Sequence, residues 1–259
     1  MASPRVDAEL LASHVLSVPR GRLPVVRAFT PEQATRFESL VARRAAREPL
    51  QHITGEAPFH GLSLAVGPGV FIPRFETELL VEWALRQPAS RVVDLCSGSG
   101  AIAVAFAANR PSATVLAVER SPAALPWLRR NVAALAPAVS VVEGDVTDSS
   151  VLSDVDGLVD LVLCNPPYVP STTPVDPEVR DHDPAEAVFA GTDGLALMPA
   201  IAARAAALLR PGGLLAIEHD DTQGESLPAL LRGFPFTDVV DHTDLAGRPR
   251  FTTARRVAD

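Results

Sequence analysis

The sequence predicts an α/β protein of the Rossmann-like class, in which helices cover both faces of a mostly parallel sheet. From Arg91 onward, short apolar runs alternate with helix-favouring stretches, the pattern of consecutive β–α–β units. The first apolar run, residues 91–95, ends in a glycine-rich turn that leads into the small-residue stretch 101–108. Ligands of open parallel sheets bind outside the carboxyl ends of the strands, so we expect site residues there.

The composition is that of a globular protein and limits the classes of partner. With 259 residues, the chain can form one large domain and a small second unit. The formal net charge of −8 disfavours a nucleic-acid backbone as the partner. No apolar run of about 18 residues and no signal-peptide pattern are found, which predicts no membrane contact. Two cysteines are too few for a disulfide framework, so we expect the cytoplasm.

The chain divides into three predicted parts. Residues 1–50 should be helical, because apolar residues recur at helical spacing and Thr30 is a good N-cap before Pro31. Residues 51–73 are rich in glycine and proline between short β-like runs, which predicts a hairpin linker. Residues 74–259 should form the α/β domain, with strands at 91–95, 114–119, 139–143, 158–164 and 213–218, helices at 76–85, 101–108, 122–135 and 195–209, and a terminal antiparallel hairpin near 236–240 and 251–255.

The glycine turn after the first strand is a candidate cofactor site, formed by Cys96, Ser97, Gly98, Ser99 and Gly100. Glycines let the backbone turn tightly and approach a ligand, and the following helix N-terminus offers free N–H groups. A plain strand-to-helix turn would have the same sequence. Ala103 takes the place of the third glycine of dinucleotide-binding loops, which favours S-adenosylmethionine, a cofactor without a pyrophosphate.

Acidic residues at two further strand ends extend this candidate site. Glu119 follows the turn by about 20 residues, the spacing of a carboxylate that accepts hydrogen bonds from ribose hydroxyls. Asp145 and Val146 close the third strand and should lie beside the adenine of a nucleoside held at Glu119. A turn cap is an equally good interpretation of Asp145.

The segment Asn165-Pro166-Pro167-Tyr168 leaves the carboxyl end of the fourth strand and is the candidate catalytic and substrate-binding site. Two prolines make the segment stiff and remove two backbone donors. What remains are carbonyl acceptors and the Asn165 amide oxygen, which can bind both hydrogens of a substrate NH2 group. Tyr168 offers a flat face for a planar amide or base. The segment therefore predicts methylation of a planar amide or amino nitrogen.

Several segments together resemble the HemK/PrmC-type release-factor glutamine methyltransferases. They are Pro-Leu-Gln-His-Ile-Thr-Gly at 49–55, Phe-Ile-Pro-Arg-Phe-Glu-Thr-Glu at 71–78, the glycine turn, Asn-Pro-Pro-Tyr, and Asp-Leu-Ala-Gly-Arg-Pro-Arg at 244–250. The chain departs from that pattern at Cys96, usually glycine, at Phe75, usually proline, and at Val146, often aromatic.

The resemblance implies a helical substrate-recognition domain, a hairpin linker and a seven-stranded methyltransferase domain. It implies a substrate, the glutamine of the Gly-Gly-Gln motif in peptide chain release factors, and a product, S-adenosylhomocysteine. It places residues 96–100, Glu119, Val146 and Asn165 at the cofactor, residues 165–168 at the glutamine, and Asp183-Pro184 beside the substrate channel. We expect a monomer with release factors as partners.

Two other functions stay open on the sequence. An adenine or cytosine amino-methyltransferase could use the same Asn-Pro-Pro-Tyr segment on a flipped base, although no basic insert is found. A non-catalytic binding module would not need Asn165 and Tyr168.

Other chemistry-bearing residues have simpler interpretations. We expect no metal site, because residues 181–183 and 219–221 resemble solvated loop charges more than paired ligands. Arg43, Arg44 and Arg47 should form a solvated basic face that could also hold a release factor. Cys96 and Cys164 should be neighbours, as small core residues or, less simply, as a redox-sensitive pair.

Overall fold

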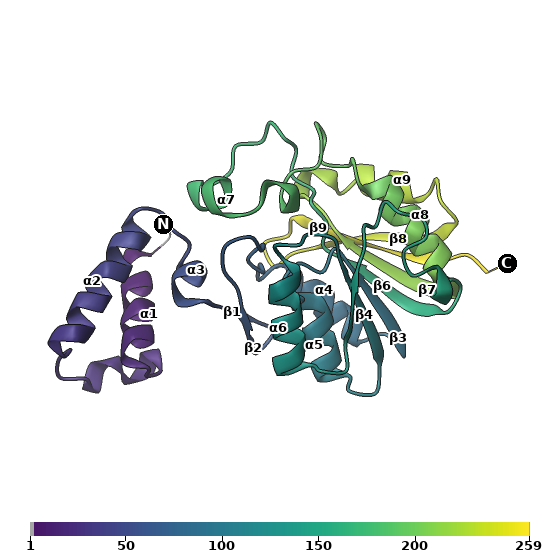
Figure 1. Ribbon diagram of the computed structural model, residues 1–259. Coiled ribbons are helices and arrows are strands. Elements are labelled where there is room, and N and C mark those ends of the chain that lie inside the picture. Colours follow the sequence, from purple (N-terminus) through teal and green to yellow (C-terminus); the bar gives the residue numbers. More distant parts are fainter. Residues whose placement is uncertain (1–2, 259) are drawn as a thin grey trace.

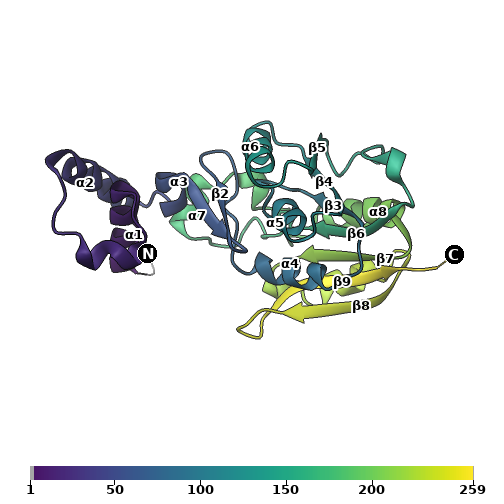
Figure 2. The same cartoon turned by 90° about the horizontal axis from the view of Figure 1, so that it is seen from below.

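The structure is a computed structural model that describes residues 3–258. A seven-stranded sheet with the order β5-β4-β3-β6-β7-β9-β8 forms its body. The pairs among β3, β4, β5, β6 and β7 are parallel, whereas β9 runs antiparallel to both β7 and β8. Figure 2 shows β8 and β9 along one edge of this sheet. The predicted Rossmann-like α/β class is confirmed.

The strands are β1 (Glu56–Phe59), β2 (Leu62–Ala65), β3 (Arg91–Leu95), β4 (Thr114–Glu119), β5 (Ser140–Glu143), β6 (Val159–Cys164), β7 (Leu209–Glu218), β8 (Phe236–Thr243) and β9 (Pro249–Arg256). The α-helices are α1 (Pro4–Leu16), α2 (Pro31–Ala45), α3 (Leu50–Thr54), α4 (Thr77–Leu85), α5 (Ala101–Asn109), α6 (Leu125–Leu135), α7 (Pro177–His182), α8 (Met198–Leu208) and α9 (Ser226–Leu231). Within residues 3–258, no helix has the length and apolar character needed to span a membrane.

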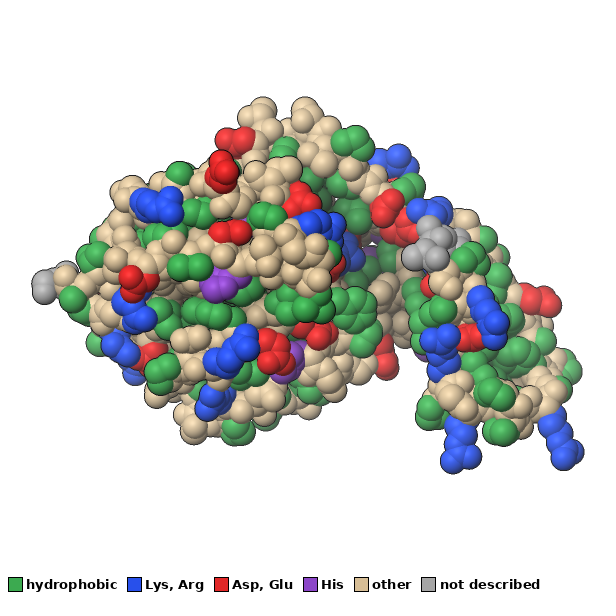
Figure 3. Space-filling view, turned by 180° about the vertical axis from the view of Figure 1, so that it is seen from behind, with side chains coloured by type: hydrophobic (Ala, Val, Ile, Leu, Met, Phe, Trp, Pro, Cys, Tyr) green, Lys and Arg blue, Asp and Glu red, His purple; other side chains and the backbone are tan. Residues whose placement is uncertain are grey.

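The N-terminal helices α1 and α2 stand apart from the sheet (Figure 1). The space-filling view shows a notch between them and the rest of the molecule (Figure 3). The predicted cap at Thr30 is present as a capping box, in which Thr30 and Gln33 each bond the backbone N–H of the other. Leu11, Val15 and Leu40 form the centre of a small core with Ile53 of α3. This core is far smaller than the two that flank the sheet.

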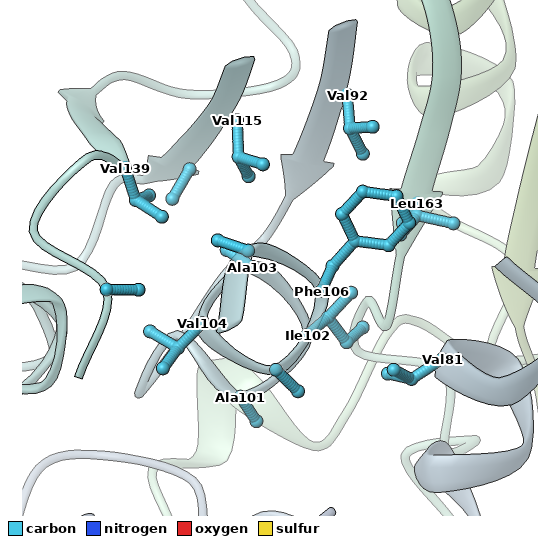
Figure 4. Close-up of a cluster of buried hydrophobic side chains, with 14 of the residues drawn as sticks. Val81, Val92, Ala101, Ile102, Ala103, Val104, Phe106, Val115, Val139 and Leu163 are labelled. Carbon is cyan, nitrogen blue, oxygen red and sulfur yellow. The ribbon is translucent and has the colours of Figure 1, made fainter. Parts of the chain in front are cut away.

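Two large cores cover the two faces of the sheet, because alternate residues of each strand point to opposite sides. Val92 of β3 packs with α4, α5 and α6, while its neighbour Val93 packs with α8 and α9. Helix α5 is apolar on every side from Ala101 to Ala107, and these residues are all buried. In Figure 4 its Phe106 points toward Val92 and Leu163 of the sheet. The core therefore fixes the strand ends from both sides.

Some predicted boundaries were wrong for identifiable reasons. Helix α3 occupies residues 50–54, where we predicted the start of a hairpin linker at 51, because Pro49 precedes it and Gly55 ends it in a left-handed conformation. Helix α7 lies in a stretch for which we predicted only loop. Strand β7 begins at Leu209 instead of residue 213. The Pro-Gly-Gly sequence at 211–213, where we predicted the end of a loop, is an irregularity inside the strand, and pairing with β6 continues on both sides of it.

Candidate functional site

A cavity opens at the carboxyl ends of β3, β4 and β6. Strand β3 lies between β4 and β6, so the strand order reverses here, which is where ligands of such sheets bind. The space amounts to about 1170 Å³ when its open mouth is counted, enough for a nucleoside and a substrate side chain. Its walls include predicted site residues from four separate segments, namely Cys96, Ser97, Gly98, Ser99, Glu119, Asp145, Val146, Asn165, Pro166, Pro167 and Tyr168.

The glycine turn is fixed mainly by backbone hydrogen bonds. The N–H of Ser97 donates to the Val118 carbonyl at 2.9 Å, and the N–H of Gly98 donates to Glu119 Oε2 at 2.7 Å. Gly100 has a φ of 85°, and a Cβ there would lie 2.6 Å from Leu128 Cδ1. Gly100 therefore shapes the turn from behind and is not part of the cavity wall.

Glu119 is a buried carboxylate at the end of β4, with 8% of its surface exposed. Its Oε1 accepts from the Ser121 N–H at 2.7 Å, and its Oε2 accepts from Gly98. An ionised carboxylate has about four acceptor positions, so lone pairs remain for hydroxyl donors in the cavity. The carboxylate thus joins the glycine turn to the neighbouring strand.

The turn after β5 closes the far side of the cavity. Asp145 Oδ1 accepts from the Thr147 N–H at 2.8 Å, and Oδ2 pairs with Arg120 at 3.0 Å. The hydrogen bond from the Thr147 N–H is the first cause of the lowered pKa of Asp145, and Arg120 acts in the same direction. The turn-cap interpretation of Asp145 is therefore correct, although the residue also lines the cavity. Val146 beside it is buried and adds an apolar surface.

The Asn165–Tyr168 turn faces the glycine turn across the cavity. Asn165 Nδ2 donates to Thr77 Oγ1 at 3.1 Å, which leaves Asn165 Oδ1 as the acceptor for a ligand. Pro166 and Pro167 are buried and line the wall. Tyr168 donates its hydroxyl hydrogen to Glu218 Oε1 at 3.0 Å. Burial, followed by the charge of Glu218, raises the pKa of Tyr168 well above its usual value, so this hydroxyl stays protonated.

Two residues behind this turn were missed by the sequence analysis. Glu218, at the end of β7, has none of its surface exposed, and Thr77 begins α4 and is also buried. Burial raises the pKa of Glu218, while the hydroxyl groups of Thr77 and Tyr168 act in the opposite direction. Glu218 could have been noticed, because it ends an apolar strand at the same edge of the sheet as Glu119.

Comparisons with known proteins give the family. Residues 1–55 match the family described as PrmC N-terminal domain, and residues 64–178 match the family described as Methyltransferase small domain. The release factor glutamine methyltransferase of Mycolicibacterium smegmatis is 54% identical over 262 residues, covering 100% of this chain and 92% of that protein. The Streptomyces coelicolor enzyme of the same name is 49% identical, covering 98% and 92%.

The chain belongs to the release factor glutamine methyltransferase family. This confirms the resemblance seen in the sequence, and it makes the chain an S-adenosylmethionine-dependent methyltransferase. A solved structure, the 16S rRNA N2 G1207 methyltransferase of T. thermophilus in complex with AdoMet and guanosine, shares the fold with a TM-score of 0.54 at 21% identity. The superposed region covers 78% of this chain and 49% of the T. thermophilus enzyme. The ribosomal protein L11 methylase from Lactobacillus delbrueckii subsp. bulgaricus has a TM-score of 0.51 at 20% identity, covering 74% and 84%.

The residues present fit the methyltransferase cofactor. A Cβ added to Gly98 would meet nothing within 4 Å, so the bare backbone leaves room on the cavity side of the turn. Cys96 has a φ of 59°, in the region that glycine adopts most easily, which agrees with glycine being usual there. The buried Glu119 offers acceptors, and Val146 offers an apolar face. These groups suit a nucleoside with hydroxyl groups better than a pyrophosphate.

Asp94 supports the glycine turn from below and is fully enclosed. Its Oδ2 accepts from the Ala103 N–H at 3.2 Å, near the start of α5. Burial raises the pKa of Asp94 to about 7, and hydrogen bonds and the charge of Glu119 modify this value. Asp94 is therefore a buried titratable group directly beside the glycine turn.

The structure corrects two predictions of solvated charge. Asp183 is buried and pairs with Arg74, and His219 is buried between the Asp220 carbonyl and Asp241 Oδ1. Both lie inside the protein because segments distant in sequence pack over them. Within residues 3–258, no group of three or more potential ligands could hold a metal ion.

The basic residues of α2 and its C-terminal end are paired instead of simply solvated. Arg44 Nη1 donates to Glu178 Oε1 of α7 at 3.1 Å, and its Nε donates to Asp7 of α1 at 2.7 Å. Arg47 also pairs with Glu178, and Arg43 pairs with Glu48. Figure 1 shows α7 between these helices and the sheet. The arginines therefore connect the N-terminal helices to the segment that leads to the cavity.

The two cysteines are neighbours, as predicted from adjacent strands. Leu95 is the register partner of Cys164, and both thiols are free. Burial, followed by a hydrogen bond with Cys96, raises the pKa of Cys164 well above its usual value. A protonated, enclosed thiol is a poor nucleophile, so the pair agrees best with small core residues.

Proposed function

We propose that this chain transfers a methyl group from S-adenosylmethionine to the side-chain amide nitrogen of the glutamine in the Gly-Gly-Gln motif of peptide chain release factors. One observation carries the proposal. A single cavity joins Gly98 and Glu119 to Asn165, whose amide oxygen accepts no hydrogen bond from any residue between 3 and 258. The full-length relatives named release factor glutamine methyltransferase supply the substrate class.

The cofactor would lie on the β3–β4 side of the cavity. Gly98 and its neighbours in the turn would pass beneath it, Glu119 would accept from ribose hydroxyls, and Asp145 and Val146 would flank the adenine. When bound, S-adenosylmethionine supplies an electrophilic methyl group on a positively charged sulfur. Apart from this sulfur, the proposed contacts of the cofactor require no charge on the ligand.

The glutamine amide would lie against the Asn165–Tyr168 turn. Asn165 Oδ1 and the Pro166 carbonyl would each accept one N–H of the amide, which sets the direction of its nitrogen lone pair. Accepting these hydrogens also raises the electron density on a nitrogen that is otherwise a poor nucleophile. Tyr168 would stack against the planar amide. An amide oxygen is too weak a base to keep a proton, so the proton lost as the new bond forms would pass to water at the open mouth of the cavity.

The helical residues 1–50 would form a release-factor recognition domain, residues 51–73 the linker, and residues 74–259 the catalytic domain. The paired Arg44 and Glu178 would hold the first unit against the segment that borders the cavity. We also propose that the chain acts as a monomer in the cytoplasm, where translation termination takes place. Its two free cysteines agree with a reducing compartment.

A labelled-methyl transfer assay tests this function directly. A release factor, the same factor with its Gly-Gly-Gln glutamine changed to Ala, DNA and RNA would be compared side by side. We expect label only in the unaltered release factor. Label in a nucleic acid instead would identify a base amino group as the substrate, and cofactor binding without transfer to any of them would indicate a binding module.

A further inference from the structure

The buried Glu218 carboxylate is connected to both ends of the Asn165–Tyr168 turn but does not line the cavity. Its Oε1 accepts from the Tyr168 hydroxyl at 3.0 Å. Its Oε2 is buried and accepts no hydrogen bond within residues 3–258, and the Thr77 hydroxyl lies near enough to act against the rise in the pKa of Glu218. Thr77 in turn accepts from Asn165 Nδ2. One carboxylate thus reaches Asn165 through Thr77, and Tyr168 directly.

The hydrogen-bonded series from Glu218 through Thr77 to Asn165 has a fixed order of donors and acceptors. Thr77 already accepts from Asn165, and an ionised carboxylate only accepts, so the single hydroxyl hydrogen of Thr77 is available to the unpaired Glu218 Oε2. Only lone pairs of Thr77 then face Asn165, and they select its NH2 group. The opposite atom of the amide, Oδ1, is left facing the cavity. Asn165 would otherwise be free to present either side, because its oxygen and NH2 group have nearly the same shape.

This order of donors and acceptors requires a charged Glu218. Burial raises the pKa of Glu218, and the hydroxyl groups of Thr77 and Tyr168 act against that effect. Arg250 of β9 lies close enough for its positive charge to stabilise Glu218, although burial opposes ionisation. Arg250 itself is anchored by Asp244, with Nη2 3.5 Å from Oδ2. The carboxylate is therefore held in a polar cluster behind the turn.

We propose that Glu218 and Thr77 are positioning residues that fix the Asn165 amide with its oxygen toward the substrate, so that the site accepts an NH2 group and rejects an isosteric acceptor. The inference rests on the proposed function, since it concerns how the same turn selects glutamine over glutamate. Neither residue transfers a proton to or from the substrate.

Three variants and one matched control test the order of donors and acceptors from Glu218 through Thr77 to Asn165. Thr77→Val removes the relay, Thr77→Ser restores it, and Glu218→Gln places an NH2 donor where a carboxylate oxygen had been. In Glu218→Gln the Thr77 hydroxyl is free to donate to Asn165 Oδ1 and so to reverse the amide. The control is Thr252→Val, which alters an equally buried threonine on β9 that does not line the cavity.

Activity and affinity should change in a way that a loss of folding would not. We expect Thr77→Val and Glu218→Gln to lower kcat about 10- to 100-fold with unchanged cofactor Kd, and Thr77→Ser and Thr252→Val to stay within threefold of wild type. The ratio of Kd values for release factors carrying Glu or Gln at the target position should fall about tenfold in Thr77→Val and Glu218→Gln only.

Two outcomes separate this inference from the proposed function. If the wild type methylates glutamine but Thr77→Val keeps its kcat and its Gln-over-Glu preference, positioning by Thr77 and Glu218 is wrong and the proposed function stands. If the wild type does not methylate glutamine at all, the proposed function fails first. Should Glu218→Gln not fold, the Thr77→Val and Thr77→Ser pair alone decides.

Discussion

The two walls of the cavity are built by different means. On the cofactor side, the turn after β3 is held by backbone hydrogen bonds, by the close fit of Gly100 against Leu128, and by a carboxylate only 21 residues away in the chain. On the substrate side, side chains hold the turn after β6. Thr77 lies 88 residues from Asn165, and Glu218 lies 50 residues from Tyr168.

The turn on the cofactor side is thus held mainly by residues close to it in the sequence. The turn on the substrate side is held by residues far from it in the sequence. The Tyr168 carbonyl shows the same dependence on distant residues, because it accepts from Gln223 Nε2 at 3.0 Å. A Cβ on Gly194 would lie in conflict with that carbonyl as well. Changes on the cofactor side should therefore affect cofactor binding or folding, whereas changes on the substrate side should affect turnover.

The largest expected effect concerns stability and Asp94 beneath the cofactor wall. A rise in its pKa from 3.8 to about 7 on folding corresponds to on the order of 4 kcal/mol. Because the folded state favours the neutral carboxyl, its contribution is fully present below pH 3.8 and is lost as the pH rises to about 7. Urea unfolding of Asp94→Asn should show a variant that gains stability over wild type across this range.

Asp160→Asn is the control for this pH dependence. Although burial acts in the other direction, hydrogen bonds from Arg210 and the backbone lower the pKa of Asp160. Its stabilising contribution is therefore present above the pKa of the unfolded chain and is lost on acidification. Parallel pH profiles of the Asp94→Asn and Asp160→Asn variants, relative to wild type, would contradict the account.

On the substrate wall, Asn165→Ala should lower kcat about 100- to 1000-fold. The reason is the loss of the acceptor that orients the reacting NH2 group, an effect equivalent to ~3–4 kcal/mol. Cofactor affinity, measured by calorimetry, should change by less than about fivefold, since Asn165 belongs to the turn after β6 and not to the glycine turn. Turnover close to that of wild type would refute the assigned role of Asn165.

Two glycines of the same turn should respond differently to alanine. Gly100→Ala forces a Cβ to within 2.6 Å of Leu128 Cδ1 at a φ of 85°, and we expect a loss of about 2–3 kcal/mol in the free energy of unfolding. Gly98→Ala meets nothing within 4 Å and should cost only about 1 kcal/mol, while it weakens cofactor binding. Equal losses of stability in chemical denaturation would show that the turn is not shaped from behind.

The smallest expected effect is that of Glu119→Gln on cofactor affinity. Replacing a charged acceptor by a neutral one should raise the cofactor Kd about tenfold, or ~1.4 kcal/mol, with kcat at saturation nearly unchanged. Glu143→Gln, at the end of the neighbouring strand β5 but exposed, is the matched control and should leave the Kd as it is. A fall in kcat without a change in Kd would break the division between the two walls.

The sequence predicted the structure best where that structure depends on neighbours in the chain. The strand pattern, the capped helix at Thr30 and the glycine turn all follow from local residue preferences, and each is present. The carboxyl ends of parallel strands meet at one edge of the sheet, so the strand pattern alone was enough to assign Glu119 and Asn165 to the same place.

What could not be predicted depends on contacts between distant segments. Thr77 lies in segment 71–78, which supported the family resemblance, yet nothing in that segment marks it as the partner of Asn165. Asp183 and His219 carry the residue types of a solvated loop, yet packing encloses both. The role of α7 was equally hidden, because Glu178 gains its meaning only from Arg44 and Arg47, more than 130 residues away. Burial, which decides the behaviour of these groups, is not a local property.

A crystal structure with S-adenosylhomocysteine and a Gly-Gly-Gln peptide of a release factor tests the central claim most directly. We predict that the glutamine NH2 nitrogen lies about 2.7–3.2 Å from both Asn165 Oδ1 and the Pro166 carbonyl, on the side facing the cofactor sulfur. A glutamine bound with its amide oxygen toward Asn165, or held elsewhere with the Asn165–Tyr168 turn empty, would contradict it.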